Sequence, residues 1–299
     1  MKLGYNTWSM PTLSFSDAIT HCAKLGFDTV EVTVSEGWTT DVMTLERSAA
    51  RTWRRIADEA GITITSLTAN APVLVRGHPW EAARERLTRS FALAAELQRP
   101  GERIPVSLTA SGPAETPASM PVSSGEAWTA NRSLVIERFG DLAGIAARSG
   151  ARVALEPHFA TVVCNKERAL DVLSAIASPS LGLNLDISHF AVQGLSIAEA
   201  VQTLGPHAVA CEVKDQRGVA PDFQFLIPGE GDFDYVSFLW ALAESGYDGS
   251  VAVEISVLRQ RIVGYDPYDA AARSYAVLSQ AFLEAGIARR RESSERPKV

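Results

Sequence analysis

The feature that most constrains the fold is an alternation of short apolar runs and longer helical patterns that recurs from end to end of the 299 residues. Glycine follows several helical patterns just before the next strand, as in AGITI and SGARVAL, which is typical of a helix C-cap. The apolar runs, which have the length and β-branched content of strands, lie at 2–8, 29–34, 62–69, 104–110, 152–158, 181–188, 208–215 and 250–256. Eight strand–helix units predict a single (β/α)₈ TIM barrel of the α/β class.

A doubly wound open sheet is the structural alternative, although such sheets usually have fewer strands or a visible break in topology. No linker rich in Pro, Gly or Ser divides the chain, so we expect one barrel domain over 1–288. The charged end 289–299 lacks periodicity and is expected to be disordered. Residues 110–128 are expected to form a long loop. Pro105 makes the fourth strand the least regular, because proline cannot donate a ladder hydrogen bond.

Charge and cysteine content narrow the class of partner. A net charge of −7 and a pI near 5.4 argue against nucleic-acid and anionic-membrane partners, which favour basic surfaces. Three cysteines are too few for a disulfide framework, which favours a reducing compartment. The N-terminal residues read as a strand rather than a leader, and no apolar run is long enough to span a membrane. We expect a cytoplasmic protein and leave homo-oligomerisation open.

Four acidic residues share one orientation on the last four predicted strands. Side chains alternate along a strand, and in each of these strands Val, Leu, Ile or Cys occupies the face opposite the acid. The bulky faces suit the helix-packed outside of a barrel, which turns Glu156, Asp186, Glu212 and Glu254 inward. Near the strand C-termini, where barrel enzymes keep their chemistry, these carboxylates would repel one another unless a divalent cation lies among them. Taken singly, each acid could instead cap a helix or pair with a lysine.

An ordered set of motifs points to a known family. ALEPH, NLDISH, EVKD and VEIS, together with PGEGDFDY and GYDGSVAVEIS, resemble the xylose isomerase-like TIM barrels of the sugar phosphate isomerase/epimerase family, related to endonuclease IV. The resemblance covers nearly the whole chain and implies that Glu156, Asp186 and Glu254 are metal ligands. Many members have a histidine ligand where this chain has Glu212. Because an all-carboxylate site is hard, we expect one divalent cation, Mn²⁺ or Mg²⁺, rather than Zn²⁺.

Six further residues are candidates for substrate contacts. His189 follows Asp186 by three residues and matches a family histidine that contacts substrate or orients the site. His158 shares the strand face of Glu156, and Lys214 also faces inward. Each of these side chains could alternatively serve packing, capping or ion pairing. The full set of candidates is His158, His189, Lys214, Arg217, Trp8 and Asn6. The PGEGDFDY stretch is interpreted as a turn in which Asp232 or Asp234 caps the next helix.

These observations predict a metal-dependent isomerase or epimerase that acts on a sugar or sugar derivative through an enediolate. Glu156 and Glu254 would serve as the proton-transfer pair. The same enolate could expel a β-substituent, so the alternative is a dehydratase or lyase acting on a keto-sugar or keto-glycoside. A non-catalytic sugar-binding barrel is a third hypothesis. Endonuclease chemistry is disfavoured, because it needs a multi-metal cluster with several histidines and the chain has five in all.

Overall fold

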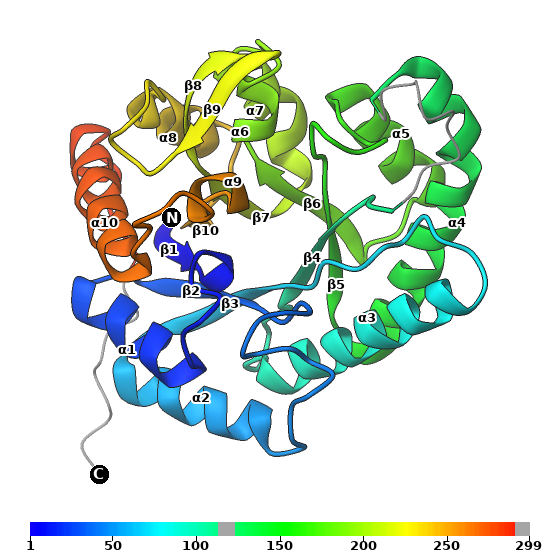
Figure 1. Ribbon diagram of the computed structural model, residues 1–299, viewed down its shortest axis with the longest axis horizontal. Helices are drawn as coiled ribbons and strands as arrows, with labels where there is room; N and C mark the ends of the chain where they lie inside the picture. Colours follow the sequence, from blue (N-terminus) through cyan, green and yellow to red (C-terminus); the bar gives the residue numbers. More distant parts are fainter. Residues whose placement is uncertain (113–122, 291–299) are drawn as a thin grey trace.

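Eight parallel strands close into a barrel in the computed structural model, which describes residues 1–112 and 123–290 (Figure 1). Their order around the barrel is β1-β10-β7-β6-β5-β4-β3-β2. The strands are β1 Lys2–Asn6, β2 Thr29–Thr33, β3 Thr63–Thr68, β4 Pro105–Thr109, β5 Arg152–Glu156, β6 Leu181–Asp186, β7 Ala208–Val213 and β10 Ser250–Val253. Closure of the sheet excludes the doubly wound alternative and confirms the (β/α)₈ barrel.

Helices surround the barrel and follow its strands along the chain (Figure 1). The main ones are α1 Phe15–Leu25, α2 Ala49–Ala60, α3 His78–Leu97, α4 Gly125–Ser149, α5 Lys166–Ile176, α7 Ile197–Leu204, α8 Tyr235–Glu244 and α10 Pro267–Glu284. Gly61 and Gly150 end α2 and α4 with φ values of 71° and 81°, a left-handed conformation that favours glycine. The glycines before the strands are therefore helix C-caps, as their positions in the sequence predict.

The alternation along the strands separates the two sides of the barrel wall. Val153 and Leu155 of β5 and Val251 and Val253 of β10 are fully buried members of the apolar core. Pro105 is the first residue of β4, a position where a missing N–H is tolerated. The apolar faces thus pack outward against the helices, and the polar faces of the same strands are left for the barrel interior.

Several short elements lie between the main units and were not predicted. The chain leaves the barrel after Val213 and forms an antiparallel hairpin of β8 (Asp215–Val219) and β9 (Asp222–Leu226). The other short elements are η1 Thr7–Ser9, α6 Ser188–Ala191, η2 Gly205–His207 and α9 Val257–Gln260. The predicted strand 208–215 therefore spans two elements. Polar Asp215, Gln216 and Arg217 give the hairpin little of the apolar alternation by which a strand is recognised.

The two segments expected to be irregular lie partly outside the described residues. The expected loop 110–128 ends earlier than predicted, because Ser124 caps α4 by accepting a hydrogen bond from the Ala127 N–H. In the expected tail 289–299, the described Arg289 forms an ion pair with Asp28 at 2.8 Å. The rest of both segments, 113–122 and 291–299, lies outside the described residues. Within the described parts of the chain, no helix is both long and apolar enough to cross a membrane.

Candidate active site

Three of the four predicted inward acids gather at the C-terminal end of the barrel strands. Glu156 and Asp186 are the last residues of β5 and β6, and Glu254 directly follows β10. All three are buried, with 5%, 0% and 8% of their surfaces exposed. Burial of three carboxylates is unfavourable unless positive charge or hydrogen bonds compensate them. The surrounding side chains therefore decide what this cluster can do.

Lys214 supplies the positive charge in the centre of this cluster. Its ammonium group donates a short hydrogen bond to Asp186 and lies 2.7 Å from Glu254 Oε1. Burial alone would lower the pKa of Lys214, but Asp186 and Glu254 outweigh it and hold that pKa well above its usual value. Lys214 is thus a buried, charged bridge between two strand ends, in contact with two of the predicted ligands.

Two imidazole rings form one wall of the cluster. His189 Nε2 lies 3.0 Å from Glu156 Oε1 and 3.3 Å from Asp186 Oδ2. The ring of His158 lies against that of His189, with the centroids 3.9 Å apart. Burial lowers the pKa of both histidines to about 3, so both rings are neutral near pH 7. A neutral imidazole is the form that ligates metals.

Glu156, Asp186 and His189 are spaced closely enough to ligate a single ion. One ligand atom from each lies within 4.8 Å of the other two, and all three side chains are buried. Two carboxylates and a neutral imidazole are a donor set that fits a divalent transition metal or Mg²⁺. The sequence predicts that His189 contacts substrate or orients the site, not that it ligates the ion; its place on α6, shortly after β6, brings it to the same point as the two carboxylates.

The acids of the cluster differ in their affinity for protons. Burial raises the pKa of Glu254 to about 7, with Lys214 opposing the shift. Burial likewise raises the pKa of Glu156. Burial alone would also raise the pKa of Asp186, but the ammonium of Lys214 outweighs it and keeps that pKa below its usual value. Asp186 is therefore a permanent anion near neutral pH, whereas Glu254 can gain and lose a proton.

Glu212 lies one inward position deeper than Glu254, because the register of β7 with β10 places it beside Ala252. Its two carboxylate oxygens accept hydrogen bonds from Asn6 Nδ2 at 2.5 Å and from Asn184 Nδ2 at 2.6 Å. The pairing of β7 with β6 places Glu212 beside Asp186, so the four acids are staggered around the barrel rather than held at one height. Alternation fixes which face a side chain takes but not its depth. Burial, followed by the charge of Glu31, raises the pKa of Glu212 well above its usual value.

The remaining predicted substrate residues lie in two places. Asn6 is buried at the C-terminal end of β1 and donates a hydrogen bond to Glu212, whereas Trp8 is half-buried and stacks on Trp38 with ring centroids 4.2 Å apart. Arg217 is exposed on β8, where it contacts Asp232 at 3.2 Å and the Glu230 carbonyl at 2.7 Å. The structure thus brings His158, His189 and Lys214 to the cluster, while the described contacts of Arg217 are within its own loop.

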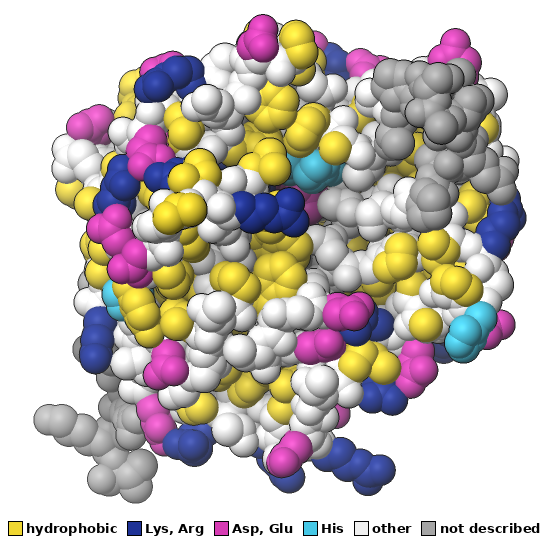
Figure 2. Space-filling view, viewed as in Figure 1, with side chains coloured by type: hydrophobic (Ala, Val, Ile, Leu, Met, Phe, Trp, Pro, Cys, Tyr) yellow, Lys and Arg dark blue, Asp and Glu magenta, His cyan; other side chains and the backbone are white. Residues whose placement is uncertain are grey.

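The β8–β9 hairpin adds an aromatic wall that the sequence did not predict. Phe225 lies 5.7 Å from the ring of His189, and Phe159 contacts both Phe223 and Phe225, at 5.2 and 5.8 Å between centroids. Figure 2 shows hydrophobic side chains gathered on this face of the molecule, over the hairpin and α9. The alternation of Phe223 and Phe225 in DFQFL could have predicted a strand, but the surrounding segment is too polar for the pattern to be recognised.

Asp215 anchors the loop that follows the hairpin. Its carboxylate accepts hydrogen bonds from the N–H groups of Gly229, Gly231 and Phe233 at 2.8, 3.0 and 3.2 Å. A β-carbon at Gly231 would collide with this carboxylate, so glycine is required there. The PGEGDFDY stretch is therefore a turn, as predicted, and Asp234 is the residue that caps α8, by accepting from the Ser237 N–H.

Solved structures similar in fold include sugar-converting enzymes and metal-bound proteins. A D-psicose 3-epimerase from Clostridium cellulolyticum, solved with D-tagatose, has a TM-score of 0.75 at 18% identity over 95% of this chain and 99% of that one. A Mycobacterium smegmatis xylose isomerase-like barrel in complex with magnesium scores 0.70 at 18% identity, over 95% and 97%. The IOLI protein with a bound zinc atom scores 0.72 at 19% identity, over 95% and 98%. At these identities the likeness shows the fold.

Relatives in sequence extend this likeness. The uncharacterised YfiH of Bacillus subtilis is 24% identical over 294 residues, which cover 86% of this chain and 93% of YfiH. An inosose isomerase of Bacillus velezensis is 31% identical over 121 residues. That match covers 38% of this chain and less than half, 43%, of the isomerase. The family model of the xylose isomerase-like TIM barrel matches residues 19–280, and the chain belongs to this family.

Proposed function

We propose that the protein is a divalent-cation-dependent isomerase or epimerase of a sugar or sugar derivative. The observation that carries this proposal is the convergence of Glu156, Asp186 and His189 on one point at the C-terminal end of the barrel. Glu254 and Lys214 lie directly beside them. Sugar epimerases and isomerases among the proteins of similar fold and sequence support the same class of reaction.

Glu156, Asp186 and His189 would hold the cation, with Glu254 as the neighbouring carboxylate. The sequence also predicts Glu212 as a ligand, and this assignment stays a prediction that substitution of Glu212 tests. Bound there, the cation would polarise a substrate carbonyl and a neighbouring hydroxyl, acidifying the C–H bond between them. We propose Mn²⁺ or Mg²⁺, because carboxylate oxygens outnumber imidazole nitrogens in the set.

Proton transfer is assigned to Glu156, which ends β5, and Glu254, which directly follows β10. A general base works best when its pKa lies near the working pH, and the pKa of Glu254 is raised to about 7. One of the two would remove the proton from the carbon next to the carbonyl, and the other would return a proton to the product. Lys214 holds Glu254 in place through its ion pair and can donate a hydrogen bond to a substrate oxygen.

The walls of the site suit a sugar. Carbohydrates combine hydroxyl groups with apolar C–H faces, and aromatic rings pack against such faces. His158 and Phe225 flank the cluster on one side, and Trp8 belongs to a stacked aromatic pair in the turn after β1. We assign His158, His189, Lys214 and Trp8 to substrate contacts. Asn6 would act through its hydrogen bond to Glu212, and Arg217 remains a proposed contact from the hairpin loop.

Isotope exchange tests the proposal. The purified protein, supplied with Mn²⁺, is incubated with a panel of ketoses and keto-glycosides in D₂O. Deuterium is expected on the carbon next to the carbonyl of the turned-over substrate, together with an isomer or epimer as product. Release of water or an aglycone would instead establish the elimination alternative. Absence of label from every carbon of a converted substrate would contradict proton transfer by Glu156 and Glu254.

A matched pair of variants assigns the base. Glu254→Gln keeps the volume of the side chain but removes its basic oxygen, so turnover should fall about 10²–10⁴-fold. Glu244→Gln makes the same change at the exposed end of α8 and should leave turnover unchanged. Equal labelling rates in wild type and Glu254→Gln would show that the base lies elsewhere, with Glu156 the next residue to test.

A further inference from the structure

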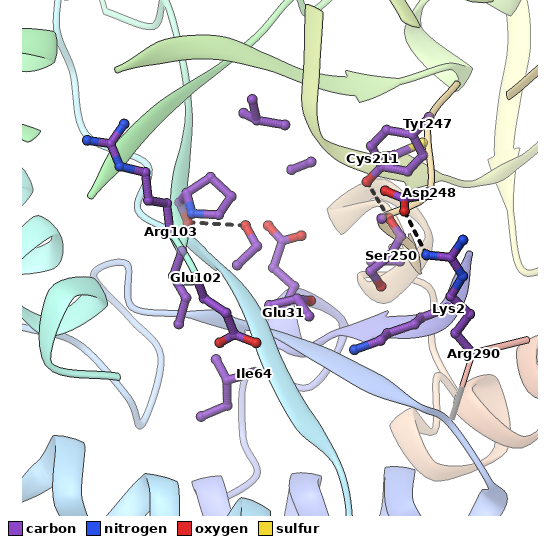
Figure 3. Close-up of a pocket in the computed structure, with 18 residues that line it drawn as sticks. Lys2, Glu31, Ile64, Glu102, Arg103, Cys211, Tyr247, Asp248, Ser250 and Arg290 are labelled. Carbon is purple, nitrogen blue, oxygen red and sulfur yellow. Dashed lines mark hydrogen bonds and ion pairs between the residues drawn. The ribbon is translucent and has the colours of Figure 1, made fainter. Parts of the chain in front are cut away.

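A cavity of about 480 Å³ opens at the N-terminal end of the barrel, opposite the carboxylate cluster. The first residues of β1, β4 and β10 lie on its wall: Lys2, Pro105 and Ser250. Figure 3 shows Lys2 and Ser250 there. Its volume lies within the range of small-molecule sites. The proposed reaction uses the other end of the strands, so this cavity has no role in it.

A single buried carboxyl group lies at the bottom of this cavity. Glu31 of β2 is 2% exposed, and Figure 3 shows its carboxyl pointing into the space. Its Oε1 accepts a hydrogen bond from Thr68 Oγ1 at 2.6 Å. Within residues 1–112 and 123–290, no lysine, arginine or histidine forms an ion pair with it. Burial, together with the charges of Glu254 and Glu156, raises its pKa to about 8, and hydrogen bonds from Thr68 and Ser66 oppose this rise.

Most of the inner wall is apolar. Ile64, Ile104, Cys211 and Ala252 are all buried members of it. Lys2, Ser66 and Ser250 add polar groups to the lining, and at the rim Arg290 is paired with Asp248 at 2.7 Å while Glu102 and Arg103 are exposed. The cavity therefore combines a largely apolar inner wall with one buried carboxyl group at its base.

This combination selects among classes of ligand. A bare metal ion needs several oxygen ligands, and Glu31 is the only carboxylate at the bottom. An anion would be repelled by the ionised carboxylate, and a neutral alcohol would leave its charge uncompensated. An ammonium group with a short carbon chain satisfies both features, because the charge meets Glu31 and the chain removes apolar wall from water.

We propose that this cavity is a second binding site, specific for small organic amines. The ammonium group donates hydrogen bonds to the Glu31 carboxylate, and the carbon chain packs against Ile64 and Ile104. The site is independent of the proposed isomerase activity, because none of the residues that would hold the catalytic cation lines it.

Calorimetric titration with n-butylammonium chloride tests the proposal, with 1-butanol and sodium butyrate as neutral and anionic probes of the same chain length. The full chain is used at pH 8.5, where Glu31 is largely ionised and the amine is still protonated, at constant ionic strength. Butylammonium should bind saturably at one site per chain, and the other two probes should not. Binding of butanol with equal affinity, or no saturable binding of butylammonium, would overturn the proposal.

Two carboxyl variants locate the ammonium group. Glu31→Gln keeps the shape and the Thr68 contact but removes the charge, so the affinity should fall at least tenfold, as for loss of a charged hydrogen bond. Glu102→Gln removes an exposed carboxylate from the rim of the same cavity and should bind as the wild type does. An unchanged affinity in Glu31→Gln, or an equal loss in Glu102→Gln, would contradict the assignment.

A blocking variant keeps the test independent of charge. Ser66→Leu places a larger side chain beside Glu31 and should abolish binding by filling the space. Circular dichroism confirms the fold of each variant. Retained affinity in a folded Ser66→Leu protein would place the amine outside the cavity and overturn the proposal.

Discussion

Buried carboxylates at the C-terminal end of the barrel and deeper in its interior have different hydrogen-bonding and charge partners. At the C-terminal end, Asp186 and Glu254 share the ammonium of Lys214, and Glu156 lies against His189. Deeper in the barrel interior, Glu31 and Glu212 accept hydrogen bonds from the neutral side chains of Thr68, Asn6 and Asn184. The ammonium keeps the pKa of Asp186 below its usual value and opposes the rise in the pKa of Glu254, whereas burial beside neutral donors raises the pKa of Glu31 to about 8 and that of Glu212 well above its usual value.

The two arrangements are connected through the barrel interior. Thr68 Oγ1 donates to Glu31 and accepts from Asn6 Nδ2 at 3.0 Å, and the same Asn6 nitrogen donates to Glu212. Hydrogen bonds therefore run without a break from the bottom cavity to the floor of the candidate active site. Substitutions in the two regions should therefore distinguish carboxylates that depend on a neighbouring cation from carboxylates that depend on neutral hydrogen-bond donors.

Lys214→Met is expected to have the largest effect on stability. Removing the ammonium leaves Asp186 and Glu254 buried without their cation, which typically costs about 3–5 kcal/mol in the free energy of unfolding. Urea denaturation at pH 7 measures this loss. Added Mn²⁺ should restore part of it, because a bound cation replaces the missing charge. Lys166→Met, which removes the partner of the exposed Glu199, should cost far less, because solvent screens an ion pair at the surface. Equal losses in the two variants would contradict the comparison.

Glu31→Gln should stabilise the protein, and the gain should depend on pH. The pKa of Glu31 is raised from 4.5 to about 8 in the folded state, so between these values the folded protein binds more protons than the unfolded chain. Stability from this group is complete below pH 4.5 and is lost as the pH rises toward 8. Glutamine removes this loss, with a gain on the order of 3 kcal/mol at pH 7. Urea denaturation from pH 5 to pH 8 should show a flatter profile for the variant; an unchanged slope would show that Glu31 is ionised when folded.

Much of the architecture could be predicted from the sequence, because each strand–helix unit carries its own signal. Apolar strands, capping glycines and the inward face of Glu156, Asp186 and Glu254 all follow from local patterns. The depth of Glu212 depends instead on how β7 pairs with β10, which strand alternation does not encode. The short helix α6 brings His189 to the cluster, and the polar segment of β8 begins the hairpin that forms the aromatic wall. Neither segment has a strong local sequence pattern.

Glu212→Gln is expected to have the smallest effect and decides the role of this residue. If Glu212 mainly accepts the hydrogen bonds from Asn6 and Asn184, glutamine still offers one acceptor oxygen. The affinity for Mn²⁺ should then change less than about tenfold. A ligand would behave differently, since loss of a direct charged donor weakens metal binding far more. Calorimetric titration of the variant separates these outcomes. A loss larger than 100-fold would establish Glu212 as the ligand that the sequence predicts.

The most direct test of the central claim is a calorimetric Mn²⁺ titration of metal-stripped protein, with wild type, Asp186→Asn and Asp171→Asn compared. Asp171 is a matched control, because it forms an ion pair with Arg132 near the molecular surface. Wild type and Asp171→Asn should each bind one ion per chain, and Asp186→Asn should lose at least tenfold in affinity. Absence of saturable binding by the wild type, or equal affinity in Asp186→Asn, would contradict a metal site at the C-terminal end of the barrel.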